Sequence, residues 1–224
     1  MISENLSHDT IILEPEYDNL KDYEYIDITY DVYEWIDKNI KSKGKKKTGE
    51  KTCRFVQFKD GKKGIIPQIL QKLLKQRKYV RKEMIYKTIE YKTDNNNELF
   101  SGLIDKDTQE IIKLKTLEGD SKEIKKTDII NIKDTYNEFE QEVKDGLQLA
   151  YKITANSLYG QIGAKTSPIC LIDIAASTTA TGRKLLHMAR DKTEEKFDGA
   201  KVVYGDSIPH YELLKLKINN KIIV

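Results

Sequence analysis

The stretch "KITANSLYG", residues Lys152–Gly160, carries the most chemical information in this sequence. On a helix, Lys152, Asn156 and Tyr159 stand at positions i, i+4 and i+7, so they share one face. A cation can neutralise a triphosphate, an amide can bind phosphate or sugar, and a ring can pack against a base. Gly160 lets another backbone approach closely. An ordinary amphipathic helix with a half-buried tyrosine has the same spacing, so spacing alone leaves both interpretations open.

A second helix is predicted upstream in "GIIPQILQKLLKQRKYVRK", residues 64–82. Pro67 stands near its start, where the missing N–H of proline costs least, and apolar residues follow at helical spacing. Arg77 and Arg81 are one turn apart on another face. A guanidinium binds phosphate through paired N–H donors, so this face suits a polyphosphate. A solvated basic helix surface is the alternative interpretation.

The rest of the chain divides into short extended segments and one more long helix. Turn residues punctuate residues 88–133, which predicts a small β insertion between two helices. The helix that contains Lys152 runs over 135–160, with Gly160 as its stop. Another helix covers about 172–197. The remaining predictions are a helix over 31–40 with Trp35 on its apolar side, a lysine-rich loop over 41–51, a strand over 53–58, and a strand running into an acidic turn over 202–206.

Composition narrows the class of protein. The 224 residues suffice for one sizeable core or for one domain with a smaller module. Mean hydropathy is −0.62, no apolar run approaches the roughly 18 residues of a membrane span, and the first residues do not resemble a signal peptide. We therefore expect no membrane association and an intracellular location. Cys53 and Cys170 lie far apart and form no metal-binding pattern.

The net charge of +3 is unevenly distributed. Lysines crowd residues 41–51, and residues 72–87 are strongly basic. Local basic patches of this kind suggest a partner that carries phosphate groups. Solvated surface is the alternative, and composition does not separate the two.

Taken together and in this order, these segments resemble family B DNA polymerases, and among them those of large eukaryotic DNA viruses. Residues 152–164, "KITANSLYGQIGA", and residues 64–82 resemble the two helices of the family's fingers. "AASTTATGRKLL", residues 175–186, resembles the helix that leads back into the palm. "VVYGD", residues 202–206, resembles the first half of the palm turn Tyr-Gly-Asp-Thr-Asp-Ser. "MISENLSHDT", residues 1–10, resembles the segment that follows the first palm motif.

The resemblance implies an α+β fold, namely a partial palm with a long antiparallel helical hairpin, the fingers. The implied domains are a partial palm segment over 1–62, the fingers over 63–160, a palm helix and metal-turn strand over 161–206, and a further segment over 207–224. Within the fingers the implied elements are a first helix over 67–87, the β insertion over 88–133 and a second helix over 135–160.

The implied activity is DNA-directed DNA synthesis, with primer–template DNA and deoxynucleoside triphosphates as partners and Mg²⁺ as cofactor. The primer 3′-hydroxyl would attack the α-phosphate in a two-metal mechanism. The residues assigned to the incoming nucleotide are Arg77, Arg81, Lys152 and Asn156. Those assigned to the template or nascent base pair are Tyr159 and Gly160. Asp206 is assigned to the metal, and Asp206 and Lys152 are assigned catalytic roles. A viral polymerase would work in the host nucleus or a cytoplasmic viral factory.

Two departures from the family pattern affect the metal site. The first palm motif, with its metal-binding aspartate, is absent, because the sequence starts just after the position of that motif. The second aspartate of the palm turn is also absent, because Ser207 and Ile208 follow Asp206. A two-metal site needs carboxylates from both places. We therefore expect this chain to be inactive alone, and a non-catalytic nucleic-acid-binding fragment is the alternative.

Residues 207–224 resemble the beginning of an intein, a self-splicing insert. Ser207 directly follows Asp206, and its hydroxyl would attack the Asp206 carbonyl as the nucleophile. A degraded or misread end is the competing interpretation. In a split gene, a partner chain would carry the rest of the palm and of the intein.

Overall fold

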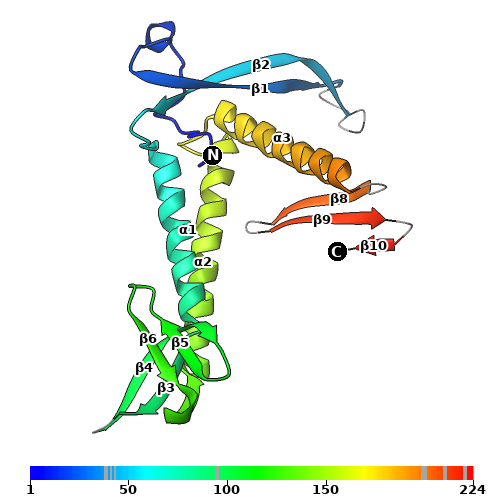
Figure 1. Ribbon diagram of the computed structural model, residues 1–224. Coiled ribbons are helices and arrows are strands. Elements are labelled where there is room, and N and C mark those ends of the chain that lie inside the picture. The colour runs from blue at the N-terminus through cyan, green and yellow to red at the C-terminus, as the bar shows by residue number, and fades with distance from the viewer. Residues whose placement is uncertain are drawn as a thin grey trace. The chain divides into compact units, whose positions relative to one another are not determined.

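The computed structural model describes residues 1–37, 40, 42, 44–93, 96–197, 201–208, 211–218 and 221–223, with side chains up to residue 202. The chain forms two compact units, one of residues 1–67 with 161–224 and one of residues 68–160. The described residues contain three α-helices and three sheets, and all the strand pairs between named strands are antiparallel (Figure 1). The fold is therefore a mixed α and β fold.

The first unit is built around a two-stranded ribbon and one helix. Strands β1 (Tyr23–Trp35) and β2 (Lys45–Phe58) pair along their whole length, and α3 (Ile172–Lys196) packs against β1. Side chains alternate between the two faces of a strand. The apolar side chains on one face of the ribbon are therefore buried together, and the buried residues from the ribbon and α3 are Ile28, Cys53, Phe55, Ile174 and Ser177.

The ribbon corrects two predictions. The helix expected over 31–40 is wrong, because β1 continues to Trp35, and the loop expected over 41–51 is wrong, because β2 begins at Lys45. Beyond the strands, the Ile36 amide still donates to the Gly44 carbonyl over 3.2 Å. The aromatic and β-branched residues of β1 favour a strand. The lysines of β2 remain exposed on the ribbon, so no apolar periodicity marks them in the sequence.

The N-terminal segment caps helix α1 (Ile65–Glu83). The side chains of Asn5 and Ser7 accept hydrogen bonds from the amides of residues 64 and 66 over 2.7 and 3.2 Å, and both carboxylate oxygens of Asp9 lie 3.1 Å from the amide of residue 65. The first amides of a helix have no partner within the helix. These three side chains therefore provide the partners that α1 lacks at its start.

Replacing Asp9 by alanine is expected to lower the free energy of unfolding of the first unit by about 1–2 kcal/mol, as for other lost N-caps. Urea unfolding followed by the fluorescence of Trp35, the single tryptophan of the chain, measures the change. Asp22→Ala, which removes an exposed turn carboxylate, is the matched control and should leave stability within about 0.5 kcal/mol. Equal losses in both variants would contradict the capping role.

The second unit contains a five-stranded antiparallel sheet, whose strands come between two helices in the sequence. Its strands are β3 (Lys87–Lys92), β4 (Asn97–Asp107), β5 (Ile111–Lys115), β6 (Ser121–Lys125) and β7 (Ile129–Asp134), in the order β6-β5-β4-β3-β7. Apolar side chains on one side of the sheet form a small core, which comprises Ile89, Tyr91, Ile112, Leu114 and Ile124. This sheet occupies the segment for which a β insertion is expected from the sequence.

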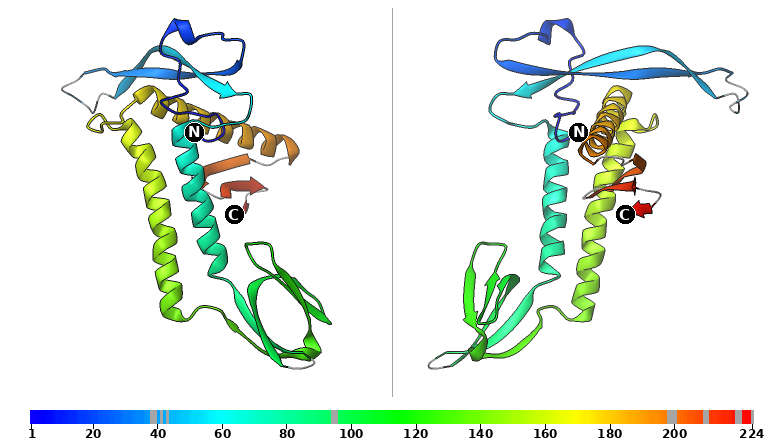
Figure 2. Two further views of the ribbon diagram at one scale, coloured as in Figure 1. Left: turned by 90° about the vertical axis from the view of Figure 1, so that its left-hand side faces the viewer. Right: turned by 45° about the vertical axis from the view of Figure 1, so that its right-hand side comes forward.

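Helices α1 and α2 (Glu138–Gly163) lie side by side within the second unit (Figure 2). The Lys144 ammonium forms an ion pair with the Glu83 carboxylate over 2.8 Å. At its start, α2 has a capping box, in which Asn137 and Glu140 each accept a hydrogen bond from the other's amide over 2.9 Å. The helix continues past Gly160, so the predicted stop is wrong. Glycine inside a helix costs only about 1 kcal/mol, which the helix tolerates.

The C-terminal strands β8 (Lys201–Ile208), β9 (Tyr211–Ile218) and β10 (Lys221–Ile223) form a sheet in the order β10-β9-β8. Asp206 lies inside β8, and its backbone pairs with that of Leu213 in β9. The expected acidic turn at 202–206 is therefore wrong, because the strand runs on through these residues. Among the residues that the structure describes, no helix is long and apolar enough to cross a membrane.

Candidate functional site

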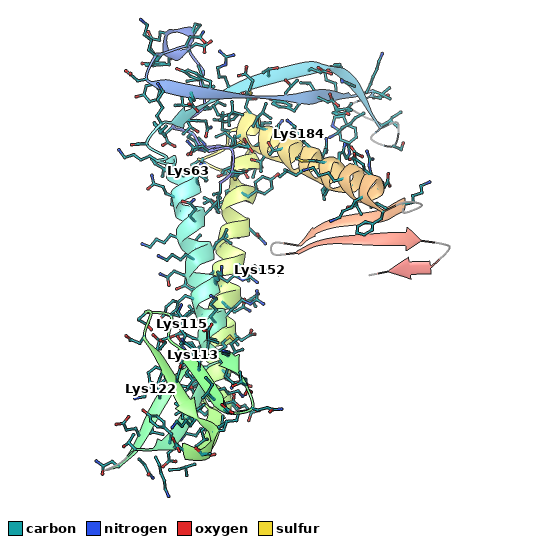
Figure 3. All side chains as sticks on the ribbon, viewed as in Figure 1. Lys63, Lys113, Lys115, Lys122, Lys152 and Lys184 are labelled. Carbon is teal, nitrogen blue, oxygen red and sulfur yellow. The ribbon has the colours of Figure 1, made fainter. Side chains whose placement is uncertain are left out.

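The residues predicted to bind a polyphosphate lie on α1 and α2 in the second unit. Arg81 and Asn156 are exposed, and Lys152, on α2, is half-buried (Figure 3). Arg77 is buried, with 9% of its surface exposed, and its Nε donates to Gln148 Oε1 over 3.1 Å. The structure thus brings the two helices that carry these side chains together, and Arg77 forms part of the contact between them.

The contact between Arg77 and Gln148 fixes the register of the two antiparallel helices. Lys152 lies one turn beyond Gln148, and Arg81 lies one turn from Arg77 in the opposite direction. Four residues of a helix span about 6 Å along its axis. The three cations therefore follow one another along the helix pair, with about 12 Å of axial distance between the first and the last. The axial order of this row of cations is therefore Arg81, Arg77 and Lys152.

The three cations differ in how much of their charge is free for a ligand. Arg77 already uses one N–H on Gln148. Arg81 and Lys152 form no hydrogen bond or ion pair with another residue in the described part of the chain. A guanidinium and an ammonium without a protein counter-ion favour an anionic ligand. Arg81 and Lys152 are therefore the two side chains most open to phosphate.

Tyr159 and Gly160 lie at the far end of the same helix. The side chain of Tyr159 is 39% exposed. Apart from its chain neighbours and the backbone of its own helix, no described atom lies within 4 Å of the place where a β-carbon would stand at Gly160. The described residues therefore leave space over this glycine, and the helix surface there is open to another molecule.

Several contacts that hold the second unit together carry no signal in the sequence. Burial disfavours the charge of Lys144, but the hydrogen bond and charge of Glu83 keep its pKa above the usual value. Lys144 also lies 4.2 Å from the centre of the Tyr136 ring. Glu83 and Lys144 are 61 residues apart in the sequence, so only the pairing of the two helices reveals their contact.

Two tyrosines tie the β insertion to helix α1 and the segment after it. The Tyr79 hydroxyl donates to Glu118 Oε1 over 2.6 Å, and this hydrogen bond to a carboxylate raises the pKa of Tyr79 to about 12. The Tyr86 hydroxyl accepts a hydrogen bond from the Leu117 amide over 2.8 Å. Both bonds reach the loop between β5 and β6, so that loop is fixed beside α1.

A polar cluster joins the ribbon to α3 in the first unit. Tyr30 Oη donates to Asp173 Oδ1 over 2.7 Å, and Lys51 Nζ lies 2.7 Å from Asp173 Oδ2. Burial alone would raise the pKa of Asp173, but the hydrogen bonds from Lys51 and Tyr30 hold it below the usual value. The hydrogen bond to Asp173 in turn raises the pKa of Lys51. Burial raises the pKa of the neighbouring Cys53 thiol, which therefore stays neutral.

This cluster predicts how the stability of the first unit depends on pH. Because the pKa of Asp173 is lowered by folding, its contribution is present above the ordinary pKa of about 3.9 and is lost as pH falls through the folded value. The raised pKa of Lys51 gives a contribution present below about 10.4 and lost as pH rises through the folded value. Asp173→Asn should therefore lower stability between about pH 5 and 9 and make little difference near pH 2.

Urea unfolding of the wild-type chain and Asp173→Asn at pH 7 and pH 2, followed by Trp35 fluorescence, checks this prediction. Asp105→Asn, a change of an exposed carboxylate in the second unit, is the control and should leave the unfolding of the first unit unchanged at both pH values. A wild-type advantage over Asp173→Asn that is as large at pH 2 as at pH 7 would contradict the role of the ion pair.

The predicted metal site is incomplete in the residues present. Among the described side chains, no group of three or more His, Cys, Asp or Glu residues is placed to hold a metal ion. Asp206 lies in β8, and its side chain is outside the described residues, as are those of Tyr204 and Ser207. The residues after Asp206 supply no second carboxylate.

Comparison with known proteins gives one consistent result. A protein-family model described as DNA polymerase family B matches residues 110–209. The chain is 48% identical over 219 residues to the DNA polymerase of Pyramimonas orientalis virus, covering 97% of this chain and 17% of that polymerase. It is 34% identical over 230 residues to the DNA polymerase of Phaeocystis pouchetii virus, covering 93% and 17%. A shorter match, 37% over 84 residues, covers 34% of this chain and 8% of the Oryza sativa DNA polymerase delta catalytic subunit.

Proposed function

Because the chain is related to a segment of the family B DNA polymerases of large DNA viruses, we propose that it forms part of a DNA-directed DNA polymerase. The observation that carries the proposal is the 48% identity along 97% of the chain. The chain spans 17% of the length of the viral relatives, so the complete activity would need the other parts of such an enzyme.

In this proposal the helix pair α1–α2 with its β insertion is the fingers, over residues 63–160. Residues 1–62 and 161–206 belong to the palm. Division of the chain into units over 1–67 with 161–224 and over 68–160 agrees with this assignment. The capped start of α1 would then be the point where the first fingers helix leaves the palm.

The row of cations binds the triphosphate of the incoming deoxynucleotide. Lys152 and Arg81, which have no counter-ion among the described residues, neutralise phosphate charge. Arg77 holds the two helices in register through Gln148 and offers its remaining N–H donors. Asn156, one turn beyond Lys152, holds the nucleotide, and Tyr159 with Gly160 contacts the template or nascent base pair.

In the proposed reaction, the primer 3′-hydroxyl attacks the α-phosphorus and pyrophosphate leaves. Charge develops on the phosphate oxygens in the transition state, and Lys152 stabilises it as a fixed cation. Asp206 supplies one carboxylate near the reaction centre. The complete enzyme would supply the other carboxylates for Mg²⁺ from elsewhere in its palm.

A chimeric polymerase tests the proposal. Residues 1–206 would replace the matching segment of the Pyramimonas orientalis virus polymerase, and primer extension would be measured with Mg²⁺ and all four deoxynucleotides. Template-directed extension is expected from the chimera and none from the isolated chain. A chimera with the Phaeocystis pouchetii virus segment is the matched control. If that control extends primers and the folded test chimera does not, the proposal is wrong.

The residues from Ser207 onward form, in this proposal, the beginning of an intein. Ser207 follows Asp206 directly, and the family match ends two residues later, at residue 209. The Ser207 hydroxyl attacks the Asp206 carbonyl, so the Asp206–Ser207 amide bond breaks and an ester forms. The hydroxyl proton passes to the freed amine of Ser207, so the step balances without another reactant.

Co-expression with a partner chain that carries the remaining intein and the end of the palm tests this step. Mass spectrometry should detect a ligated polymerase with the wild-type chain and none with Ser207→Ala. A ligated product from both, or from neither, would contradict the role of Ser207.

A further inference from the structure

The distal half of the β1–β2 ribbon presents aromatic rings and lysines on one face. Tyr33 is 49% exposed and Trp35 is 41% exposed. In the strand register Tyr33 faces Lys47 and Trp35 faces Lys45. Directly opposed residues of an antiparallel pair lie on the same face. These four residues, called here the aromatic–lysine face, therefore place each ring of β1 beside a lysine of β2.

The two lysines of this face differ in their partners. Lys47 lies 2.7 Å from the Asp31 carboxylate and 2.6 Å from that of Glu50, so protein groups already balance its charge. The Lys45 ammonium lies 4.6 Å from the centre of the Trp35 ring. No described carboxylate pairs with Lys45. Lys45 therefore has a cation–π contact and a charge that remains available to an anion.

The sequence around the ribbon tip is strongly basic. Residues 36–49 contain six lysines and one aspartate. Among the described residues, Lys45 and Lys46 are exposed at this end of the ribbon. Positive charge of this kind attracts a polyanion and raises its rate of association.

A cavity of about 330 Å³ lies beside Tyr33, which is the one residue of the aromatic–lysine face that lines it. A separate cavity of about 440 Å³ lies beside Lys184 and is lined by none of the four residues. The smaller cavity is lined by Thr29, Tyr30, Asp31 and Tyr33 of β1 and by Ala176, Thr179, Ala180 and Arg183 of α3. Small-ligand clefts begin at about 300 Å³. Arg183 is exposed, so the cavity beside Tyr33 combines an aromatic wall with a guanidinium.

We infer that the aromatic–lysine face, together with Arg183, binds single-stranded DNA. Unpaired bases stack on Trp35 and Tyr33, and Lys45 and Arg183 contact the phosphates between them. Rings exposed beside cations are the features with which proteins bind single strands without sequence preference. The choice of DNA over RNA rests on the proposed function. The binding itself does not, because none of these residues belongs to the row of cations on α1 and α2.

Trp35 allows a direct test, because it is the single tryptophan of the chain. The full chain would be titrated with an oligo-dT strand at low salt while tryptophan fluorescence is recorded. Stacking on Trp35 should quench the emission, and labelled oligo-dT should give the same dissociation constant by fluorescence anisotropy. The same titration is repeated with the matching DNA duplex and with oligo-rU. These two experiments distinguish unpaired DNA from duplex DNA and from RNA.

Three substitutions locate the binding surface. Trp35→Ala should weaken oligo-dT binding about 5- to 100-fold, the range for loss of one stacked base, and Trp35→Tyr should retain most of the affinity. Lys45→Ala should weaken binding and lower the slope of log affinity against log salt by about 1. The control is Lys115→Ala, which removes a lysine of β5 in the second unit (Figure 3) and should change nothing.

The inference is wrong if Trp35 emission does not respond to oligo-dT, or if Trp35→Ala binds as tightly as the wild-type chain. Equal affinity for the duplex would contradict base stacking, and equal affinity for oligo-rU would contradict the choice of DNA. Lys152→Ala separates this inference from the proposed function. That variant should bind oligo-dT normally, so loss of polymerase activity and loss of the Trp35 response are independent results.

Discussion

Replacement of Lys152 by alanine in the chimeric polymerase is expected to lower nucleotide incorporation about 10²- to 10³-fold, the usual effect of removing one preorganised group that stabilises developing charge. Lys152 is half-buried on α2 and has no ion-pair partner among the described residues. Its ammonium therefore has no protein counter-ion among the described residues. Single-turnover incorporation over a range of deoxynucleotide concentrations measures both the maximal rate and the apparent affinity.

Lys46→Ala provides the matched control for this experiment. Lys46 is an exposed lysine of the ribbon and faces Glu34 in the strand register. Its loss should change incorporation by less than about threefold, because Lys46 lies outside the row of cations and substitutions of exposed residues usually have small effects. Lys152→Arg should restore part of the rate, since it returns the charge in a different shape. Equal losses for Lys152→Ala and Lys46→Ala would show that Lys152 does not contact the triphosphate.

Replacement of Gly64 by alanine is expected to destabilise the first unit by about 2–3 kcal/mol or more, as overpacking of a tight site does. A β-carbon at Gly64 would stand 2.8 Å from the Cβ atom of Ser7, 2.8 Å from Thr10 Cγ2 and 2.9 Å from Asp9 Oδ1. Ser7 and Thr10 are buried, and all three side chains are short and held by hydrogen bonds. Ser7 and Asp9 cannot rotate away without releasing the cap of α1, and Thr10 is held by its hydrogen bonds to Ser7 and Asn5.

Gly182→Ala is the opposite case in the same unit. Gly182 lies in α3, and nothing is within 4 Å of its missing β-carbon. Alanine there should stabilise the helix by roughly 0.5–1 kcal/mol. Urea unfolding followed by Trp35 fluorescence should therefore shift in opposite directions for the two variants. A Gly64→Ala chain as stable as the wild type would show that the N-terminal segment yields easily and does not fix the start of α1.

The three long helices were predictable because each carries its signal locally. Apolar residues recur at helical spacing in α1, and the Ala-rich and Thr-rich start of α3 also favours a helix. Their ends were less predictable, because the start of α1 at Ile65 depends on side chains at residues 5–9. The ribbon was missed for a similar reason. Residues 45–51 become a strand only by pairing with β1. The segment itself has no apolar periodicity that would predict this pairing.

For the candidate site, sequence motifs named the chemical types and the order of the residues along the chain. They did not reveal that Arg77 is buried against Gln148, because that contact joins helices separated by the whole β insertion. The segment 202–206, which ends in the acidic residue Asp206, shows the opposite limit. Its motif suggests a turn, whereas pairing with β9 carries the strand through Asp206 to Ile208.

The rate at which a reagent modifies the Cys53 thiol reports how often the first unit opens locally around this residue. Cys53 is 6% exposed, between the ribbon and α3, whereas Cys170 is only partly buried. A thiol reagent can reach Cys53 only when the ribbon lifts from the helix. The rate of modification therefore reports the frequency of those openings. It measures the local stability of the contact between the ribbon and α3, separately from the global stability of the chain.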